Sequence, residues 1–217
     1  FYRSLTEVEQ EHVRDAYAFE LGKCYEQAVK ERQLQALARI DDELCAYVAD
    51  ALGLPAPSAD AALDDVDPSP ALRMVGKSWP IDGRVVAVVA DDEVSSADLA
   101  AVRSAIDAAG ALPLVVAPHG GMLGDVPVQR TFLTAASIEF DGLVALTATD
   151  DPRVLNLLAE MDRHGKALAA TPDADELLDR AGVDRSAPGV ALAAAADAAA
   201  SVLSALAQHR AWDRITA

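Results

Sequence analysis

The sequence predicts an α/β fold, in which a parallel sheet lies between two layers of helices. The first observation is the apolar run Val85–Ala90, where β-branched residues follow one another without polar alternation. Such a strand is expected to be covered on both faces, as the strands of parallel sheets are. The second observation is that Ser95 and Ser96 follow closely and can cap a helix that begins near Ala97. The third is that strand and helix patterns then alternate to the end of the chain.

Each expected element after residue 82 has a start signal, a stop signal or an apolar face. Leu99, Val102 and Ile106 share one face of the helix expected at 97–109, and Gly110 can end it. The other expected elements are strands at 112–117, 142–146 and 167–170, helices at 152–164, 173–181 and 193–210, and at most an edge strand at 189–190. Because the crossovers are long enough for parallel pairing, the fold class is a flavodoxin-like, doubly wound parallel sheet.

A small all-α helical segment is expected ahead of this domain. Ser4 with Glu7, and Thr6 with Glu9, both fit the capping box that starts a helix. A second helix is expected at about 26–37, and a third should end at Gly53, which suits a helix C-cap.

Residues 55–81 differ in composition from both neighbours, being rich in Pro, Ala, Ser and Asp. Proline at this density disfavours helix and sheet, so the sequence predicts an extended linker. Within it, Met74, Val75 and Trp79 are apolar enough to be held against a surface. The predicted organisation is therefore a helical segment at 1–54, a linker at 55–81 and a flavodoxin-like domain at 82–217.

The charge of the chain excludes some classes of partner. A formal net charge of -17 and a pI near 4.4 disfavour binding to nucleic acid or to an anionic membrane, because both need a basic surface. No apolar run approaches the roughly 20 residues of a membrane span. Cys24 and Cys45 lack the spacing of a metal or redox motif, which favours a reduced, cytoplasmic chain. The first residue is Phe1, so we expect a fragment of a longer protein.

Few residues suggest chemistry on spacing alone. The acidic loop Asp91-Asp92-Glu93 follows the first strand, where open α/β sheets place their sites. It can be a solvated loop, the magnesium-binding acids of a receiver domain, or the phosphate loop of a flavin site. The receiver needs an aspartate directly after the third strand, and three carboxylates would repel the flavin phosphate. His119 has no second ligand at metal spacing, so a loop histidine is favoured.

Several segments resemble one family, the large-subunit haem catalases, whose chain continues past the catalase core into a flavodoxin-like C-terminal domain. The likeness to the closing helices of that core lies in YRSLTEVEQ at 2–10 and FELGKC at 19–24. The likeness to the extra domain lies in GRVVA at 83–87, DEV at 92–94, SADL at 96–99 and HRAWDRI at 209–215. The resemblance thus extends over nearly the whole chain.

The resemblance implies a parent protein that disproportionates hydrogen peroxide at haem and forms a homotetramer. The family's distal histidine and asparagine and its haem-ligating tyrosine lie in an upstream part that this sequence lacks. We therefore expect no haem, no metal and no catalytic residue in this chain, which should be inactive alone. In the family the first helices pack on the catalase core. The apolar stripes carrying Phe19, Leu21, Leu37 and Leu44 should then be partly exposed here.

The extra domain is also similar to the amidotransferase-like and stress-protein superfamily, which uses a cysteine on a strand-to-helix elbow and a glutamate near the first strand. Glu93 matches the glutamate, but the elbow falls at Ala169-Ala170-Thr171, without a cysteine. The sequence thus predicts a vestigial pocket of Glu93, Ala170 and Thr171, whose chemistry lacks an activated nucleophile.

Two functions follow from these resemblances. The first is a non-catalytic C-terminal region of a large-subunit catalase, with a stabilising, assembly or chaperone-like role. Its expected partners are the catalase core and the homotetramer, or, for the isolated chain, another copy or unfolded client proteins. The alternative is a standalone hydrolase or glyoxalase of the amidotransferase-like superfamily. The missing elbow cysteine favours the first function.

Overall fold

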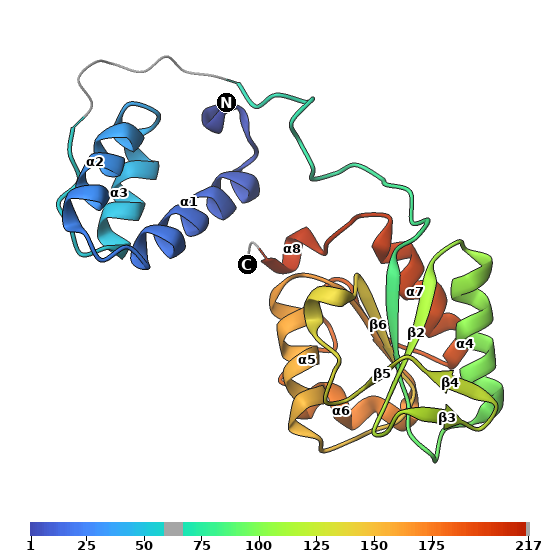
Figure 1. Cartoon of the computed structure of the whole chain (residues 1–217). Coiled ribbons are helices and arrows are strands. Elements are labelled where there is room, and N and C mark those ends of the chain that lie inside the picture. Colours follow the sequence, from blue (N-terminus) through green and yellow to red (C-terminus); the bar gives the residue numbers. More distant parts are fainter. Residues whose placement is uncertain (59–66, 216–217) are drawn as a thin grey trace. The chain divides into compact units, whose positions relative to one another are not determined.

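The computed structural model of this chain describes residues 1–58 and 67–215. The chain divides into two compact units, Phe1–Lys77 and Ser78–Ala217 (Figure 1). We call them the helical unit and the α/β unit, and each is described by itself.

The helical unit consists of helices whose ends follow ordinary capping rules. They are the short 3-10 helix η1 (Tyr2–Ser4) and the α-helices α1 (Glu7–Gly22), α2 (Gln27–Ala38) and α3 (Asp42–Ala51). At the start of α1, both the backbone N–H and the hydroxyl of Thr6 donate to the Glu9 carboxylate, at 2.9 and 2.7 Å. Of the two predicted capping boxes, Thr6 with Glu9 is therefore the one that forms. Ser4 instead lies in η1, where its hydroxyl donates to the carbonyl of Phe1.

The core of the helical unit is made by α2 and α3 with contributions from η1 and α1. Leu37 and Leu44 are buried completely, and Leu21 is 8% exposed. These three side chains therefore belong to the covered part of the apolar stripes, because the helices bury them against one another. Phe19 is 66% exposed and agrees with the expectation.

The last residues before the division pack on the helical unit. The N–H of Ser69 donates to the carbonyl of Ser4 at 2.6 Å, and the N–H of Met74 donates to Glu9 Oε1 at 2.6 Å. Burial opposes the ionisation of Glu9, but its hydrogen bonds with Thr6 and Met74 lower its pKa overall. The middle of the predicted linker, 59–66, lies outside the described residues. The boundaries predicted for the linker stay a prediction.

The α/β unit is built on a six-stranded sheet of order β5-β2-β1-β6-β7-β8, in which every neighbouring pair is parallel. Without β5 this is the flavodoxin-like strand order, which confirms the predicted fold class. The strands are β1 (Val85–Val89), β2 (Leu112–Ala117), β5 (Arg130–Thr131), β6 (Gly142–Ala145), β7 (Ala167–Ala170) and β8 (Val190–Leu192). A separate antiparallel hairpin joins β3 (Gly121–Leu123) to β4 (Val126–Val128).

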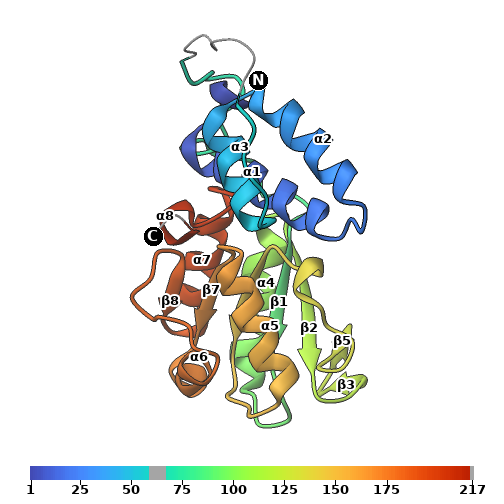
Figure 2. The same cartoon turned by 90° about the vertical axis from the view of Figure 1, so that its left-hand side faces the viewer.

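Helices cover both faces of this sheet (Figures 1 and 2). On one face lie α4 (Ser96–Ala108) and α7 (Ala195–Leu206), and on the other α5 (Pro152–Arg163) and α6 (Asp175–Arg180). Two short 3-10 helices, η2 (Ser137–Glu139) and η3 (Pro172–Ala174), and the terminal α8 (Trp212–Ile215) complete the unit. Alternate residues of β1 enter opposite cores: Val86 and Val88 face α4 and α7, whereas Ala87 and Val89 face α5. The two-sided burial predicted from the apolar run is confirmed.

Three details differ from the predictions. The strand at 167–170 consists of Ala and Leu without a β-branched residue, which is a weak strand pattern, yet it is a fully buried inner strand because its small residues fit between two layers of helices. The last helix was expected to reach Arg210, yet α7 ends at Leu206. His209 then takes φ +68°, which breaks the helix and starts α8 in a new direction. The edge strand β5 falls where no element is predicted.

The close packing of α7 on β6 gives a stability test. A Cβ at Gly142 would lie 2.8 Å from Val202 Cγ1 and 3.3 Å from the carbonyl oxygen of Ala167. Gly142→Ala should therefore destabilise the α/β unit by about 1–3 kcal/mol, measured by urea unfolding. Gly120→Ala is the matched control, since its Cβ would meet only Thr131 Cγ2 at 3.8 Å. Equal unfolding midpoints for the two variants would contradict this packing.

Candidate functional site

A pocket of about 240 Å³ lies at the carboxyl edge of the sheet. It opens where β1 and β6 end, which is where the winding of the sheet changes direction and where open α/β folds place their ligands. The residues that line it are Asp91, Glu93, Val94, Ser95, Asp98, Leu146, Thr147, Ala148 and Asp173.

The lining is acidic, and part of it is used to hold the backbone in place. Asp91 Oδ1 accepts a hydrogen bond from the N–H of Glu93 at 3.0 Å, which closes the turn after β1. Ser95 Oγ accepts from the N–H of Asp98 and caps α4, as predicted. Together with Glu93 and Asp173, these acids disfavour a phosphate group at the place where a flavodoxin-like fold would hold one.

The residues of the predicted vestigial pocket are only partly brought together. Glu93 lines the pocket, whereas Ala170 and Thr171 are not among its lining residues. Ala170 ends β7 and is completely buried. The N–H of Thr171 donates to the carbonyl of Ala145 at 2.9 Å, and its hydroxyl donates to the carbonyl of Leu146 at 3.2 Å. The Thr171 hydroxyl therefore ties β7 to β6 instead of facing a base.

Both thiols of the chain belong to the helical unit. Cys24 is half-buried, and Cys45 is buried with its Sγ donating to the carbonyl of Leu34 at 3.3 Å. Burial raises the pKa of the Cys45 thiol, and the charge of Asp42 raises it further. Cys45 is therefore a protonated, unreactive thiol at neutral pH.

The described residues form neither a metal-binding cluster nor a membrane-spanning helix. Within residues 1–58 and 67–215, no three His, Cys, Asp or Glu side chains are grouped so that they could hold a metal ion. His119 lies in the loop after β2, as the sequence predicts. In the same described ranges, no helix has the length and apolar character needed to cross a membrane.

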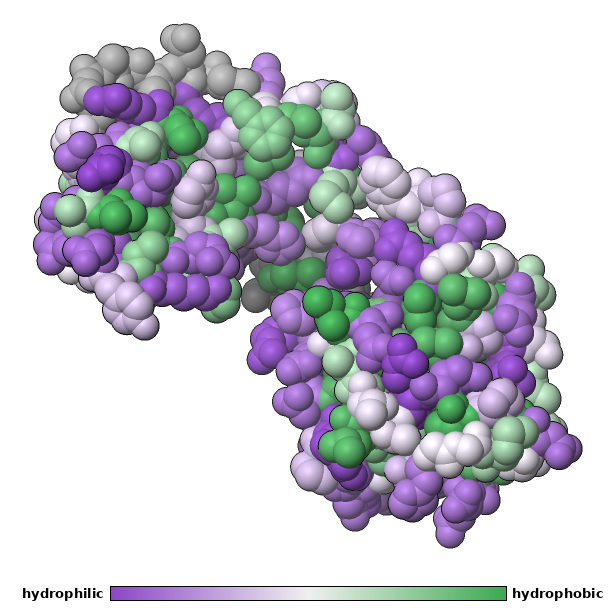
Figure 3. All heavy atoms as spheres, viewed as in Figure 1, coloured by the Kyte–Doolittle hydropathy of each residue, from purple (hydrophilic) through white to green (hydrophobic). Residues whose placement is uncertain are grey.

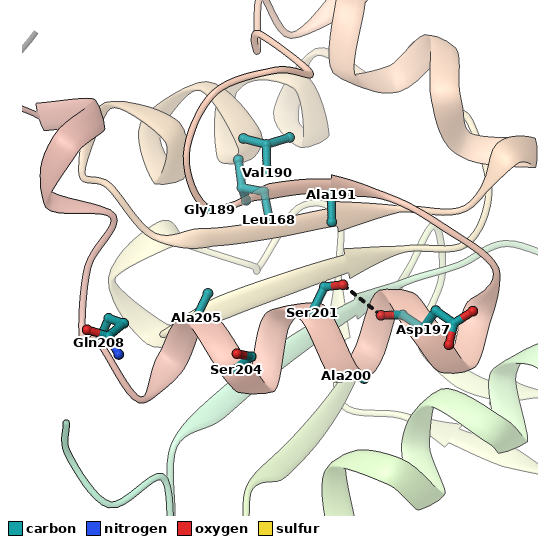
Figure 4. Close-up of a pocket in the computed structure, with 10 residues that line it drawn as sticks. All are labelled: Leu168, Gly189, Val190, Ala191, Asp197, Ala200, Ser201, Ser204, Ala205 and Gln208. Atoms are coloured by element: carbon teal, nitrogen blue, oxygen red, sulfur yellow. Dashed lines mark hydrogen bonds between the residues drawn. The ribbon is translucent and has the colours of Figure 1, made fainter.

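A wider and more open groove of about 670 Å³ runs between the edge strand β8 and α7 (Figure 4). The strand side is formed by Leu168, Gly189, Val190 and Ala191, and the helix side by Asp197, Ala200, Ser201, Ser204, Ala205 and Gln208. Ser201 Oγ donates to the backbone carbonyl of Asp197 at 2.8 Å, so this hydroxyl is engaged by its own helix. The groove offers small side chains and one carboxylate, and no constellation for catalysis.

Sequence reasoning missed a group of charged residues at the opposite, amino-terminal edge of the sheet. Arg84 Nη1 lies 2.8 Å from Asp141 Oδ1, and the N–H of Val85 donates to Asp141 Oδ2 at 3.0 Å. Burial opposes the ionisation of Asp141, but these hydrogen bonds and the Arg84 charge lower its pKa overall. The available signal was positional: Arg84 and Asp141 directly precede β1 and β6, which are parallel neighbours.

Lys166 is the buried member of this group. Its side chain is 6% exposed, and its Nζ donates to the carbonyls of Ser137 and Phe140, at 2.5 and 2.7 Å. Burial lowers the pKa of Lys166, and the positive charge of Arg210 lowers it further. The ammonium group holds the loop before β6 onto the start of β7, which is a structural role.

Comparison with known protein families accounts for nearly the whole chain. A family model described as the C-terminal domain found in long catalases matches residues 82–216. A second, described as catalase-related immune-responsive, matches residues 1–52. The first match lies within the α/β unit and the second within the helical unit.

Curated relatives agree with these matches. Catalase HPII of Mycobacterium avium is 34% identical over 245 residues, covering 100% of this chain and 35% of the relative. Catalase HPII of Pseudomonas aeruginosa is 32% identical, covering 99% of the chain and 32% of the relative. Catalase-2 of Bacillus subtilis is 26% identical, covering 99% and 33%. The chain thus spans about a third of the length of these relatives.

Proposed function

Because this chain belongs to the long-catalase family and corresponds to its C-terminal part, we propose that it is the non-catalytic C-terminal region of a large-subunit catalase. The proposed parent disproportionates hydrogen peroxide to water and oxygen at haem, and this region stabilises its assembled subunits. The observation that carries the proposal is that almost the whole chain matches proteins named catalase, and that the match covers about a third of the length of each.

Neither of the two pockets described above fits a haem. The acidic pocket and the groove beside β8 are lined by no Tyr, His, Cys or Met that could ligate iron. Tyr2 is buried, but its hydroxyl already accepts a hydrogen bond from Arg14 Nε at 2.7 Å, and burial raises its pKa. We therefore assign haem binding to the part of the parent that this chain does not contain.

The helical unit is the part best suited to contact the rest of a catalase. Apolar side chains from all three of its α-helical regions remain at its surface: Phe19, Tyr25, Val29, Ile40 and Tyr47. Figure 3 shows the surface of this unit as hydrophilic residues interrupted by hydrophobic ones. Lys23 Nζ lies over the Phe19 ring at 3.8 Å, which gives the exposed ring some cover.

The exposed apolar side chains of the helical unit would gain stability from being covered by a partner. Apolar surface contributes about 25 cal/mol per Å² when it is removed from water, so covering several exposed side chains stabilises a complex appreciably. In the proposed parent the catalase core provides this cover within a homotetramer. In the isolated chain, another copy or a partly unfolded client protein would cover this surface instead. Binding of the unfolded client would be a chaperone-like role. The net charge of -17 would help to keep such assemblies in solution.

The carboxyl-edge pocket is proposed to be a vestige of the amidotransferase-like site. In support, Glu93 lines the pocket, and the resemblance assigns the position of that superfamily's nucleophile to the turn at Ala170 and Thr171, after β7. Because the lining of this pocket includes no cysteine and the Thr171 hydroxyl bonds to backbone, no described observation favours hydrolase or glyoxalase activity. We further propose a cytoplasmic location, on the basis of two unpaired cysteines.

The assignment of haem to the missing part can be tested directly. The purified chain, incubated with haemin and desalted, should show no Soret band and no oxygen evolution from hydrogen peroxide above a buffer control. The reason is that no described pocket supplies an axial ligand. Stoichiometric haem with sustained oxygen evolution would overturn the proposal.

The role of the helical unit can be tested with surface variants of the full chain. The double variant Phe19→Gln, Tyr25→Gln should weaken self-association in light scattering and reduce protection of a heated client protein, because it removes exposed apolar surface. The matched control is Leu133→Gln, Ile138→Gln, which changes equally exposed side chains of the α/β unit. If the unmodified chain is monomeric and gives no protection, the interaction role is wrong.

A further inference from the structure

The segment 207–215, here called the C-terminal strap, closes the amino-terminal edge of the α/β unit. The N–H of Ala211 donates to the carbonyl of Gly165 at 2.8 Å. Arg214 Nη1 donates to the carbonyl of Pro188 at 2.9 Å, and Arg214 Nε lies 3.3 Å from Asp162 Oδ1. The strap thereby joins the loops that precede β7 and β8.

The strap packs closely against two glycines, Gly165 and Gly189. A Cβ at Gly165 would lie 2.6 Å from Ile215 Cγ1, and a Cβ at Gly189 would lie 2.7 Å from the Cβ of Ala211. Both glycines also have positive φ, at +62° and +77°. The strap therefore rests directly on backbone, and its contacts depend on a close fit.

The strap also meets the start of the α/β unit. The carbonyl of Ala207, at its first residue, accepts a hydrogen bond from the N–H of Trp79 at 2.8 Å. Trp79 lies just after the division between the two units. Displacement of the strap would therefore break this hydrogen bond and free the backbone at Trp79.

His209 sits near the beginning of the strap in an environment that favours its neutral form. Its Nδ1 is buried and has no hydrogen-bond partner among the described residues. An imidazolium donates from both ring nitrogens, so protonation would bury a charged N–H without an acceptor. The ring centroid of Trp212 is 6.1 Å away, at the outer limit of about 6 Å for cation–π attraction.

The charges around His209 are mostly positive. Arg84, from the start of β1, and Arg210, from the strap itself, both oppose a proton on His209, whereas Asp141 favours one. Arg210 also acts on Lys166 and on His164, the residue after α5. His164 in turn is influenced by Arg163, Lys166 and Glu160. Protonation of His209 would therefore add a positive charge to a cluster in which arginines outnumber the nearby carboxylate of Asp141.

We propose that the C-terminal strap is a pH-sensitive latch, closed while His209 is neutral and released when His209 takes up a proton in mildly acidic solution. Release exposes the imidazolium to water, where both of its N–H groups find partners and the charges of Arg84 and Arg210 are screened.

The direction of the pH dependence follows from the lowered pKa of His209. Burial lowers this pKa below its ordinary value of 6.5, and the charges of Arg210 and Arg84 lower it further. The released strap has the ordinary pKa and so binds the proton more readily than the closed strap. The closed form is fully favoured above about pH 6.5 and loses stability as the pH falls from there toward the lowered pKa.

The two tryptophans of the chain, Trp79 and Trp212, are both at this latch and report on it. Between pH 8 and 5 the tryptophan emission of the full chain should shift reversibly to the red, with a midpoint below 6.5, while far-ultraviolet circular dichroism stays constant. Hydrogen exchange at the Ala211 amide should become faster over the same range. No shift in emission, or loss of circular dichroism in step with it, would overturn the latch.

Variants identify the titrating group. His209→Asn keeps a residue that tolerates positive φ but cannot titrate, and should abolish the shift in emission. Arg210→Gln should move the midpoint to higher pH, because it removes a charge that opposes protonation. His119→Asn, in the loop after β2, is the matched control and should behave like the unmodified chain. A transition that survives unchanged in His209→Asn would contradict the proposal.

Discussion

The parallel sheet of the α/β unit must be covered on both faces, and most other features of the unit follow from that constraint. In β1 successive side chains enter opposite cores, so neither face can carry polar residues. The helices on both sides must then present matching apolar faces, as Val102 does on α4 and Leu158 on α5. Where the helices come closest, even a methyl group is excluded, as at Gly142 beneath Val202.

The same constraint confines chemistry to the two edges of the sheet. At the carboxyl edge, the loops after β1 and β6 form an acidic pocket that includes Glu93. In this pocket Asp91 and Ser95 accept hydrogen bonds from backbone N–H groups. At the amino edge, Asp141 is shared by Arg84 and the start of β1, and Lys166 is bonded to carbonyls. Among the residues that the structure describes, neither edge brings together a nucleophile and a base.

Much of this architecture could be predicted from the sequence, because local signals and packing agree. The apolar run at 85–90, the serine cap of α4 and the proline start of α5 are each read within a few residues. Predictions were incomplete where packing decides the outcome. Which residues of the apolar stripes are buried, such as Leu37 and Leu44, depends on how the helices meet, and the end of α7 depends on the left-handed conformation of His209 within the strap. The partners of Asp141 and Lys166 likewise come from the fold and not from neighbours in sequence.

The central proposal is that the catalase core covers the helical unit in the parent protein, whereas the α/β unit needs no such cover. Amide hydrogen exchange, measured by mass spectrometry on this chain and on the proposed full-length catalase, tests this most directly. The account predicts that α1, α2 and α3 exchange faster in the isolated chain, while β1, β6 and β7 are equally protected in both proteins. Equal protection of the helical unit in the two proteins, or a difference confined to the sheet, would contradict it.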